Sequence, residues 1–376
     1  HLVLFNGIRL KFNFIIVMKK LKIFVVLNKM FNLIDLFSGV GGLAQGFKET
    51  KKFNTLLAND VDKDMCEAFK LNFPKTEVIC DNIANIPFKK IVKKKVDVII
   101  GGPPCQAYST SGKRLLDDKR AYLYHEYYRS LKELKPSIFL YENVRGLLSM
   151  NNGKLFIELK NLFSSLGYKV SAQVLNAADY GVPQVRQRVI IVGTLGDHKF
   201  EYPEPTHIKK HLTLEDAISD LSFLKNGEKT KKYSTKPKNE YQKKLRSSLK
   251  EVEDHKAPNH GINLMKVIKK VPEGGTLKDI PEKFRPKSGF LNSYGRLIWK
   301  KPSMTITRNF GTPSSARCIH PKCDRALTTR EGARIQSFKD DFKFYGSISK
   351  KNLQIGNSVP PILSKAIAES IIKFLK

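Results

Sequence analysis

The sequence predicts an α/β protein with an open, mostly parallel sheet, a less regular basic insert after it, and a short helical return segment. Three observations support this. From residue 31, apolar runs of strand length alternate with amphipathic helical patterns, which is typical of a parallel sheet. This rhythm stops near residue 195, and residues 200–300 are rich in Pro, Lys and polar side chains. Helical patterns return near the end of the chain, and no internal repeat interrupts the order.

The predicted elements follow one another in a regular order. Apolar, β-branched runs predict strands at 31–37, 53–60, 76–81, 96–102, 137–144, 168–176 and 187–194. Apolar residues at helical spacing predict helices ending near 49 and covering 61–73, 125–135, 154–167, 327–338 and 359–375. Ligands of such sheets bind beyond the carboxyl ends of the strands, so candidate residues are sought there.

Length and composition restrict the class of protein. The chain has 376 residues, enough for two to three units of roughly 150 residues each. Lys and Arg exceed Asp and Glu by 67 − 35 = 32, which indicates a polyanionic partner. Five cysteines exclude a disulfide-built secreted scaffold and fit a reducing compartment such as the cytoplasm.

The first 29 residues differ from the rest. They carry six basic and no acidic residues, and basic residues interrupt every apolar run before a membrane span of about 20 residues is reached. No signal-peptide pattern is present. We therefore expect residues 1–29 to be a non-native or disordered extension, with the working protein starting near Met30. Without them the net charge is still 32 − 6 = 26.

A glycine-rich turn follows the first predicted strand. Gly39-Val40-Gly41-Gly42 stands between that strand and a helix, where glycines let the backbone approach a ligand closely. Asp60 and Asp81 end the next two strands and could bind ribose hydroxyls or a purine amino group. A purely structural turn is the alternative, and the spacing lacks the third glycine of the dinucleotide-binding pattern.

A cysteine stands on a Gly/Pro-stiffened turn after the strand at 96–102. Cys105 ends the run Gly-Gly-Pro-Pro-Cys, which displays it at the ligand edge of the sheet, where a nucleophile is expected. Cys66 and Cys80 fall inside predicted elements and look like core residues. The run from Cys318 to Cys323 contains one histidine but no second ligand pair, so we expect no metal there.

Polar residues end two further strands. Glu142 lies at the carboxyl end of the strand at 137–144, on the same edge as Cys105. Arg186 and Arg188 precede or begin the strand at 187–194. A thiol, a carboxyl group and arginines on adjacent strand ends suit a polar, planar substrate, although each alone could be a helix cap or a surface ion pair.

Taken together, these motifs resemble the C5-cytosine DNA methyltransferases of bacterial restriction–modification systems. The ordered matches are DLFSGVGG, GGPPCQAYS, YENVRG, QVRQR, LTTREGARIQSF and QIGNSVPP, and they cover almost the whole chain from Met30. The resemblance implies a doubly wound, Rossmann-like domain that uses S-adenosyl-L-methionine, with a smaller, irregular target-recognition domain. It divides the chain into a catalytic domain at 30–198, a target-recognition domain at 199–315 and a return segment at 316–376 that completes the catalytic domain.

The resemblance also implies roles for individual residues. Cys105 would add to C6 of a cytosine, Glu142 would hold and protonate its N3 edge, and Arg186 and Arg188 would bind its O2 side. The implied cofactor-binding residues are Phe37, Gly39, Val40, Gly42, Asp60, Val61, Asp81, Asn82, Pro104, Leu123, Asn357 and Ser358. Two positions depart from the family pattern: Val61 replaces the usual aromatic residue, and Asn82 stands between Asp81 and the isoleucine.

The implied partner is double-stranded DNA. A base inside a duplex must rotate out before it can react, and the small, basic segment after Cys105 resembles the mobile catalytic loop of the family. Its implied DNA contacts are Ser109, Lys113, Arg114 and Arg120. The insert would read the target, and its window 225–256 holds eleven Lys or Arg and five Asp or Glu, which could equally form a solvated surface.

Other expectations follow from the same resemblance. The enzyme would act as a monomer without membrane or metal, and a cognate restriction endonuclease would act separately. An RNA C5-cytosine methyltransferase acting on tRNA is the alternative; that branch carries a Cys-Phe-Thr tripeptide, which is absent from this sequence. A catalytically dead DNA-binding paralogue would be expected to lose Cys105 or Glu142, and both are present.

Overall fold

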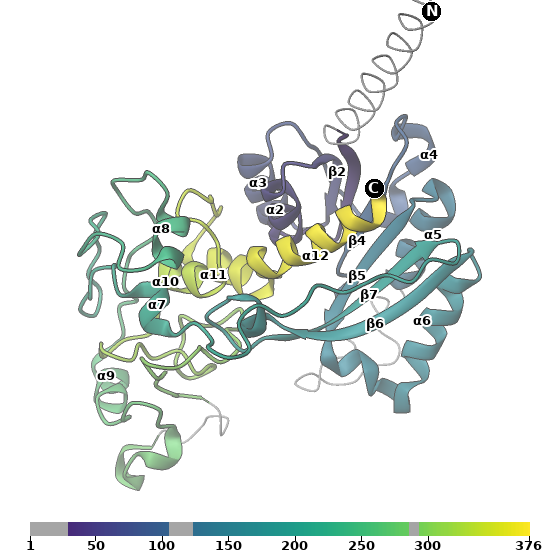
Figure 1. Cartoon of the computed structure of the whole chain (residues 1–376). Helices are drawn as coiled ribbons and strands as arrows, with labels where there is room; N and C mark the ends of the chain where they lie inside the picture. Colours follow the sequence, from purple (N-terminus) through teal and green to yellow (C-terminus); the bar gives the residue numbers. More distant parts are fainter. Residues whose placement is uncertain (1–28, 105–122, 286–292) are drawn as a thin grey trace, which may run out of the picture.

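The computed structural model describes residues 29–104, 123–285 and 293–376 (Figure 1). The expected extension at residues 1–29 therefore lies outside the described residues, apart from Lys29. The ranges 105–122 and 286–292 are likewise outside them.

A seven-stranded sheet forms the centre of the fold, in the order β3-β2-β1-β4-β5-β7-β6. Its strands are β1 (Phe31–Leu36), β2 (Phe53–Asp60), β3 (Glu77–Cys80), β4 (Val98–Gly101), β5 (Ile138–Val144), β6 (Tyr168–Asn176) and β7 (Gln187–Leu195). All neighbours pair in parallel except β7, which is antiparallel to both β5 and β6. The predicted α/β class and mostly parallel sheet are thus confirmed, and each predicted strand is present.

Helices cover both faces of the sheet because its strands are apolar on both sides. In β1, Leu33 belongs to the core under α2 (Gly42–Glu49) and α12 (Pro361–Leu375), whereas Ile34 belongs to the core on the opposite face. That second core includes residues of α4 (Phe88–Ile91), α5 (Leu123–Leu134) and α6 (Lys154–Ser164). Helix α3 (Lys63–Asn72) contributes Met65 and Phe69 to a third core, which reaches into the insert.

The insert contains short helices that the sequence did not reveal. They are α7 (Leu214–Ile218), α8 (Glu240–Arg246) and α9 (Ile262–Ile268). Elements of five to seven residues are too short to show a helical period, and local caps define them instead. The Thr213 side chain accepts from the Asp216 N–H at the start of α7, and Asn239 caps α8 in the same way.

The return segment packs in two directions. Helix α10 (Thr329–Ile335) lies against α7 of the insert, while α12 lies along α2 beside the sheet (Figure 1). Between them, α11 (Ile348–Asn357) was not predicted as a helix. In α10 the buried Arg334 guanidinium forms ion pairs with Asp220 at 3.0 Å and Asp340 at 2.6 Å. The return segment therefore joins the insert to the sheet.

Short 3-10 turns complete the described elements, and three of the six connect a strand to a helix. They cover Ile83–Asn85, Arg145–Leu148, Met150–Gly153, Ala177–Tyr180, Leu277–Asp279 and Glu282–Phe284. Over the three described ranges, we find no helix with the length and apolar character that crossing a membrane requires.

Candidate active site

The glycine loop crosses the carboxyl ends of β1 and β2. Phe37, Gly39 and Gly41 all have positive φ, at 54°, 53° and 89°, so the chain turns sharply before α2. The Gly39 N–H donates to Asp60 Oδ2 at 2.8 Å, which fastens the loop to the end of β2. This hydrogen bond brings two of the motifs that the sequence singled out into direct contact.

The loop is packed on one side and open on the other. A Cβ atom at Gly42 would lie 2.5 Å from the Val359 carbonyl oxygen and 3.0 Å from Ser358 Cβ, so only glycine fits against the start of α12. A Cβ at Gly39 would meet no atom of the described part of the chain within 4 Å. A ligand can therefore approach the loop backbone at Gly39, while Gly42 brings the last motif beside it.

A buried carboxyl group lies beneath the loop, near the Ala44 N–H. Asp35 in β1 is fully buried, and neither of its side-chain oxygens has a hydrogen bond of normal geometry among the described residues. The buried Ser38 hydroxyl likewise has no hydrogen bond of normal geometry among these residues. Burial raises the pKa of Asp35, the nearby Asp60 raises it further, and the Ala44 N–H opposes this. A buried polar group without a partner is costly, so this pair fits a site that a polar or cationic ligand completes.

Asp60 is held in a fixed position at the end of β2. Its Oδ2 accepts from Gly39 and its Oδ1 accepts from the Asp62 N–H at 3.0 Å. Burial raises the pKa of Asp60, and these two backbone donors act in the opposite direction. Val61 is 72% exposed, so its side chain stands at the open side of the loop.

The end of β3 places Asp81 and Asn82 at the same edge. Asp81 is exposed, and its Oδ1 accepts from the Asn82 N–H at 2.6 Å and from Asn85 Nδ2 at 3.1 Å. Asn82 Oδ1 accepts from the Ala84 N–H, so Asn82 starts the short turn that follows. Asn59 Nδ2 donates to the Asp81 carbonyl oxygen at 2.9 Å and ties β2 to this turn.

Further expected cofactor residues lie around this edge. Pro104 follows β4, and Leu123 is the first residue of α5; both are partly buried. Asn357 ends α11 with its side chain exposed, and the Ser358 hydroxyl donates to the Gln354 carbonyl oxygen at 2.7 Å. The structure thus brings the residues that follow β1, β2 and α11 together. Val61 and Asn357 are exposed there, whereas Val40 is only 1% exposed and packs in the core.

Glu142 and Arg188 form an ion pair between β5 and β7. Arg188 Nε lies 2.9 Å from Glu142 Oε1, and each side chain is 13% exposed. A Cβ at Gly102 would lie 2.8 Å from Glu142 Oε2, so the carboxyl group sits directly against the backbone after β4. Burial raises the pKa of Glu142, while the charges of Arg188 and Arg186 oppose that rise. This balance suits a group that must both hold and give a proton.

Arg186 has a different environment from Arg188. It is 1% exposed, and its guanidinium donates to the carbonyl oxygens of Ile306 at 3.2 Å and Gly356 at 2.9 Å. Burial lowers the pKa of Arg186, as does the charge of Arg188, and Glu142 opposes them. Arg186 therefore links its own motif, QVRQR, to the motif QIGNSVPP at the end of the chain. Arg188 is the arginine that contacts Glu142.

Five expected residues lie outside the described part of the chain. They are the candidate nucleophile and the four candidate DNA contacts, Cys105, Ser109, Lys113, Arg114 and Arg120. The described turn immediately before them is anchored, because Asn143 Nδ2 donates to the Pro103 carbonyl oxygen at 3.3 Å. Asn143 follows Glu142 in β5, so one short segment holds both the carboxyl group and the Pro-Pro turn.

Sequence reasoning did not identify three residues of this site. Asp35 had a signal, since it is an acidic residue inside an otherwise apolar strand. Gln184 and Gln336 stand in the quoted motifs QVRQR and LTTREGARIQSF, but nothing in the sequence pairs them across 152 positions. Gln184 Nε2 donates to Gln336 Oε1, and Gln336 Nε2 donates to the Ser358 carbonyl oxygen at 2.7 Å. These buried amides connect the arginine motif with the last two motifs.

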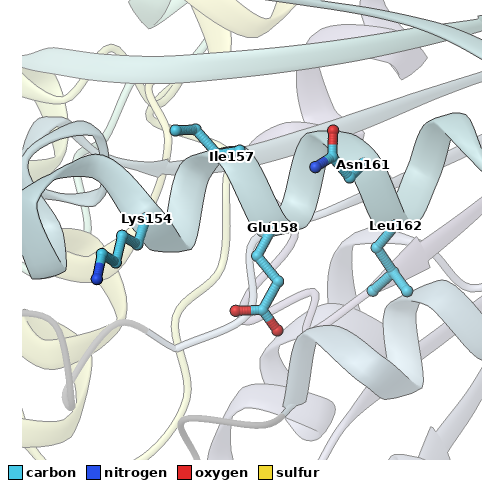
Figure 2. A pocket seen from close by; sticks show the side chains of 5 residues that line it. All are labelled: Lys154, Ile157, Glu158, Asn161 and Leu162. Carbon is cyan, nitrogen blue, oxygen red and sulfur yellow. The ribbon is translucent and has the colours of Figure 1, made fainter.

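Two other places in the molecule do not form a site of this kind. Among the described residues, a shallow hollow along α6 is lined by side chains of that helix, Lys154, Ile157, Glu158, Asn161 and Leu162 (Figure 2). Cys318 and His320 are buried, and burial lowers the pKa of His320 to about 4. Across the described ranges, no group of three or more His, Cys, Asp or Glu side chains is arranged to hold a metal ion.

The close contact at Gly102 gives a first test of the geometry. In Gly102→Ala, the new methyl group would lie 2.8 Å from Glu142 Oε2 and displace the carboxyl group from Arg188. Misplacing a reacting group by about 1 Å can cost about 100-fold in rate. We expect methyl transfer to fall by that order while the melting temperature changes little. In Gly39→Ala the new Cβ would meet no atom of the described residues within 4 Å, but a φ of 53° strains an alanine, so weaker cofactor binding should come with a lower melting temperature.

Comparisons with known proteins agree with this arrangement. The family model described as C-5 cytosine-specific DNA methylase matches residues 31–373. The type II methyltransferase M1.HphI of Haemophilus parahaemolyticus is 38% identical over 347 residues, covering 90% of this chain and 86% of that protein. M.AgeI of Thalassovita gelatinovora is 33% identical over 423 residues, covering 90% of this chain and 98% of that protein.

Solved structures show the same fold. A DNA modification methyltransferase encoded within an E. coli prophage superposes with a TM-score of 0.76 at 27% identity, covering 92% of this chain and 99% of that one. The Entamoeba histolytica methyltransferase EhMeth superposes with a TM-score of 0.64 at 19% identity, covering 93% and 100% of the two chains. At that lower identity the likeness concerns the fold alone.

Proposed function

The chain belongs to the C-5 cytosine-specific DNA methylase family, and from that premise we propose that Cys105, Glu142 and Arg188 carry its chemistry. It is a C5-cytosine DNA methyltransferase, and the family and its type II relatives favour DNA over RNA as substrate. The observation that supports the proposed roles most directly is the Glu142–Arg188 pair, packed on Gly102 at the end of β4. The Pro-Pro-Cys turn leaves β4 at that point.

The cofactor site would be the open loop and its neighbours. S-adenosyl-L-methionine, when bound, supplies an electrophilic methyl group. We assign its binding to Phe37, Gly39, Val40, Gly42, Asp60, Val61, Asp81, Asn82, Pro104, Leu123, Asn357 and Ser358. The open space at Gly39 supports this assignment. Asp35 and Ser38 support it as well, because their side-chain oxygens lack a hydrogen bond of normal geometry among the described residues and a polar, cationic ligand would supply one.

The proposed chemistry begins at the cysteine. C5 of cytosine is a poor nucleophile until a thiolate adds to C6, so Cys105 would form a bond to C6. Glu142 would place its proton at N3 as charge builds up on the ring. Arg188 would stabilise negative charge on the O2 side while keeping Glu142 in place. Arg186, with its hydrogen bonds to Ile306 and Gly356, would position this assembly without touching the base.

After methyl transfer, the ring must return to an aromatic cytosine. A base removes the proton from C5, the sulfur of Cys105 leaves C6 with the electrons of its bond, and N3 returns its proton to Glu142. The target base must stand outside the helix stack throughout, since both faces of C5 and C6 are hidden inside a duplex. Ser109, Lys113, Arg114 and Arg120 are proposed to hold the DNA backbone near it.

A substrate comparison tests this function directly. Transfer of labelled methyl groups should occur to duplex DNA and not to tRNA under the same conditions. Transfer to tRNA alone would contradict the proposal. Bisulfite sequencing of host DNA with and without the gene should then reveal one short sequence in which cytosine is protected. We propose that a separate restriction endonuclease cuts that same sequence and that the methyltransferase acts as a monomer.

The insert is proposed to read the target through its loops, with lysines binding phosphates. Lys231, Lys232 and Lys243 are exposed on it. Lys244 is also exposed, but it lies near Glu49, Lys365 and Lys339, and partial burial lowers its pKa, so Lys244 faces the catalytic part instead. Lys231, Lys232 and Lys243 are therefore the lysines to test for phosphate contact.

Replacing Lys231, Lys232 and Lys243 together with glutamine should flatten the salt dependence of DNA binding. Each lost phosphate contact reduces the slope of log affinity against log salt by about 0.9. Titrations of duplex DNA at several salt concentrations, with methyl transfer on the same samples, measure the change. An unchanged slope would mean that these lysines form a solvated surface only.

A further inference from the structure

A row of lysines lies at the amino ends of the strands, on the opposite edge from the proposed active site. Exposed lysines occupy the loops that lead into β1, β2, β4 and β5, which are neighbours in the sheet. We define this row as the amino-edge lysines: Lys29, Lys51, Lys93, Lys94, Lys95 and Lys135. In Figure 1 this edge lies near α4 and the C-terminus, on the side away from α9 of the insert.

Hydrogen bonds hold these loops side by side. The Phe31 N–H donates to the Lys52 carbonyl oxygen at 2.9 Å, and Asn32 Nδ2 donates to the Lys95 carbonyl oxygen at 2.8 Å. The Ile138 N–H donates to the Asp97 carbonyl oxygen at 3.2 Å, which joins the loop before β5. Neighbouring strands lie about 4.8 Å apart, so four strands place the row along a line of roughly 14 Å.

The row has almost no compensating charge. Asp97 is the acidic residue of these loops, and it is buried, with its Oδ2 accepting from the Asn32 N–H at 2.8 Å. Among the described residues, none of the six lysines takes part in an ion pair. The carboxyl edge has the opposite character, with Asp60, Asp62 and Asp81 at its strand ends.

Two of the lysines occupy backbone positions that disfavour them. Lys51 and Lys135 follow the ends of α2 and α5 with φ of 57° and 44°, the left-handed conformation in which glycine is the usual residue. A helix end attracts a cation from any residue of its last turn. That attraction does not require a lysine at a strained position, and it does not account for Lys93, Lys94 and Lys95, which follow the single-turn helix α4.

We propose that the amino-edge lysines bind the phosphate backbone of a second segment of duplex DNA while the first occupies the active site. The choice of DNA rests on the family assignment and not on the roles given to Cys105 or Glu142. The strands between the two edges are about 20 Å long. DNA has a persistence length of about 150 base pairs, so one short duplex cannot bend around to both edges. A straight row of lysines matches the regular line of phosphates without reading a sequence.

Such a second contact would let one enzyme hold two DNA segments at once. A methyltransferase must find rare target sequences among many other sites, and non-specific phosphate contacts support sliding and transfer between segments. The expected signature is bridging: bead-bound duplex should capture a second, labelled duplex only when the enzyme is present, and increasing salt should abolish the capture.

Paired variants that remove two charges each test this proposal. Lys51→Gly/Lys135→Gly removes two lysines and the left-handed strain, so its melting temperature should stay equal or rise. Lys94→Gln/Lys95→Gln removes two more without touching the backbone contact of residue 95. Lys154→Gln/Lys160→Gln on α6 is the matched control, since both of its lysines are exposed and lie away from the row (Figure 2 shows Lys154).

Binding of 14-base-pair duplexes is measured in the full chain, by bridging and by titration at several salt concentrations. Both amino-edge variants should lose at least tenfold in bridging, and their salt slopes for the second duplex should fall by about 1.8. Methyl transfer to a short duplex should remain at the wild-type rate. The α6 control should behave as wild type.

Three results would overturn the proposal. Bridging equal to wild type in both amino-edge variants would make the row a solvated edge. Loss of methyl transfer together with bridging would place these lysines on the path of the substrate duplex. If the variants instead lost binding to phosphatidylglycerol vesicles while bridging persisted, the edge would serve a membrane surface. Failure of the proposed catalytic roles would appear separately, as absent transfer in wild type.

Discussion

Replacing Cys105 with serine should abolish methyl transfer while duplex DNA binding survives. A hydroxyl group is a much weaker nucleophile than a thiolate, because its proton is harder to remove near neutral pH. Phosphate contacts made by the rest of the protein are unaffected by this change. Transfer of labelled methyl groups and a DNA titration on the same preparation measure the two properties independently.

A trapping experiment assigns the covalent bond. A duplex with 5-fluorocytosine at the target position should form a stable adduct, since fluorine at C5 cannot leave as a proton does. The adduct should form with the wild-type enzyme and with Cys66→Ser and Cys80→Ser, which serve as cysteine controls outside the Pro-Pro-Cys turn. An adduct that persisted in Cys105→Ser would assign the bond to another residue.

Glu142→Gln should have the second largest effect. Glutamine keeps the shape and one hydrogen bond to Arg188 but cannot transfer its proton, and general acid catalysis contributes about 100- to 10,000-fold. We expect a rate loss in that range with cofactor affinity within a few fold of wild type. Glu158→Gln on α6, whose carboxyl group accepts from Tyr124 Oη at 2.6 Å, is a matched control outside the site. A rate for Glu142→Gln within tenfold of wild type would argue against a proton-donating role.

The Glu142 carboxyl group also predicts how the rate of methyl transfer depends on pH. Burial raises the pKa of Glu142, and the positive charge of Arg188 opposes this rise. The proton is present below the folded-state pKa, so transfer should decline as pH rises through it. Arg188→Met removes the opposing charge and should move that decline to higher pH, although the maximal rate falls. A decline that moved to lower pH in pH–rate profiles would contradict the assignment.

The sheet was predictable because its strands are buried on both faces. A continuous apolar run such as residues 98–101 has no amphipathic alternative, and alternation with helices fixes a mostly parallel sheet. The reversed direction of β7 was not predictable, since strand direction depends on the connection and not on composition. Helices α7 to α9 were missed because five to seven residues do not establish a period, and residues 199–315 owe their order to caps and long-range packing.

For the site, the sequence indicated which residues meet but not what each one does there. Glu142 and Arg188 end up together because strand ends meet at one edge of the sheet. Arg186 and Arg188 are two positions apart and look equivalent in the sequence. Their difference comes from carbonyl groups 120 and 170 positions away from Arg186, contacts that no local pattern encodes. Asp35 was visible as a charge within an apolar strand, but its lack of a partner is a property of the folded chain.

The ion pairs of Arg334 constrain how this enzyme could exchange its DNA specificity by recombination. Arg334 belongs to the return segment, whereas Asp220, one of its two buried partners, arrives with the insert. A donor insert without an acidic residue at that position would leave a buried guanidinium partly uncompensated, a loss of about 3–5 kcal/mol. That is a large share of the 5–15 kcal/mol that keeps a typical domain folded. A recombinant enzyme would therefore have to fold before its new specificity could matter. Only donor inserts with a carboxylate at position 220 would meet that requirement.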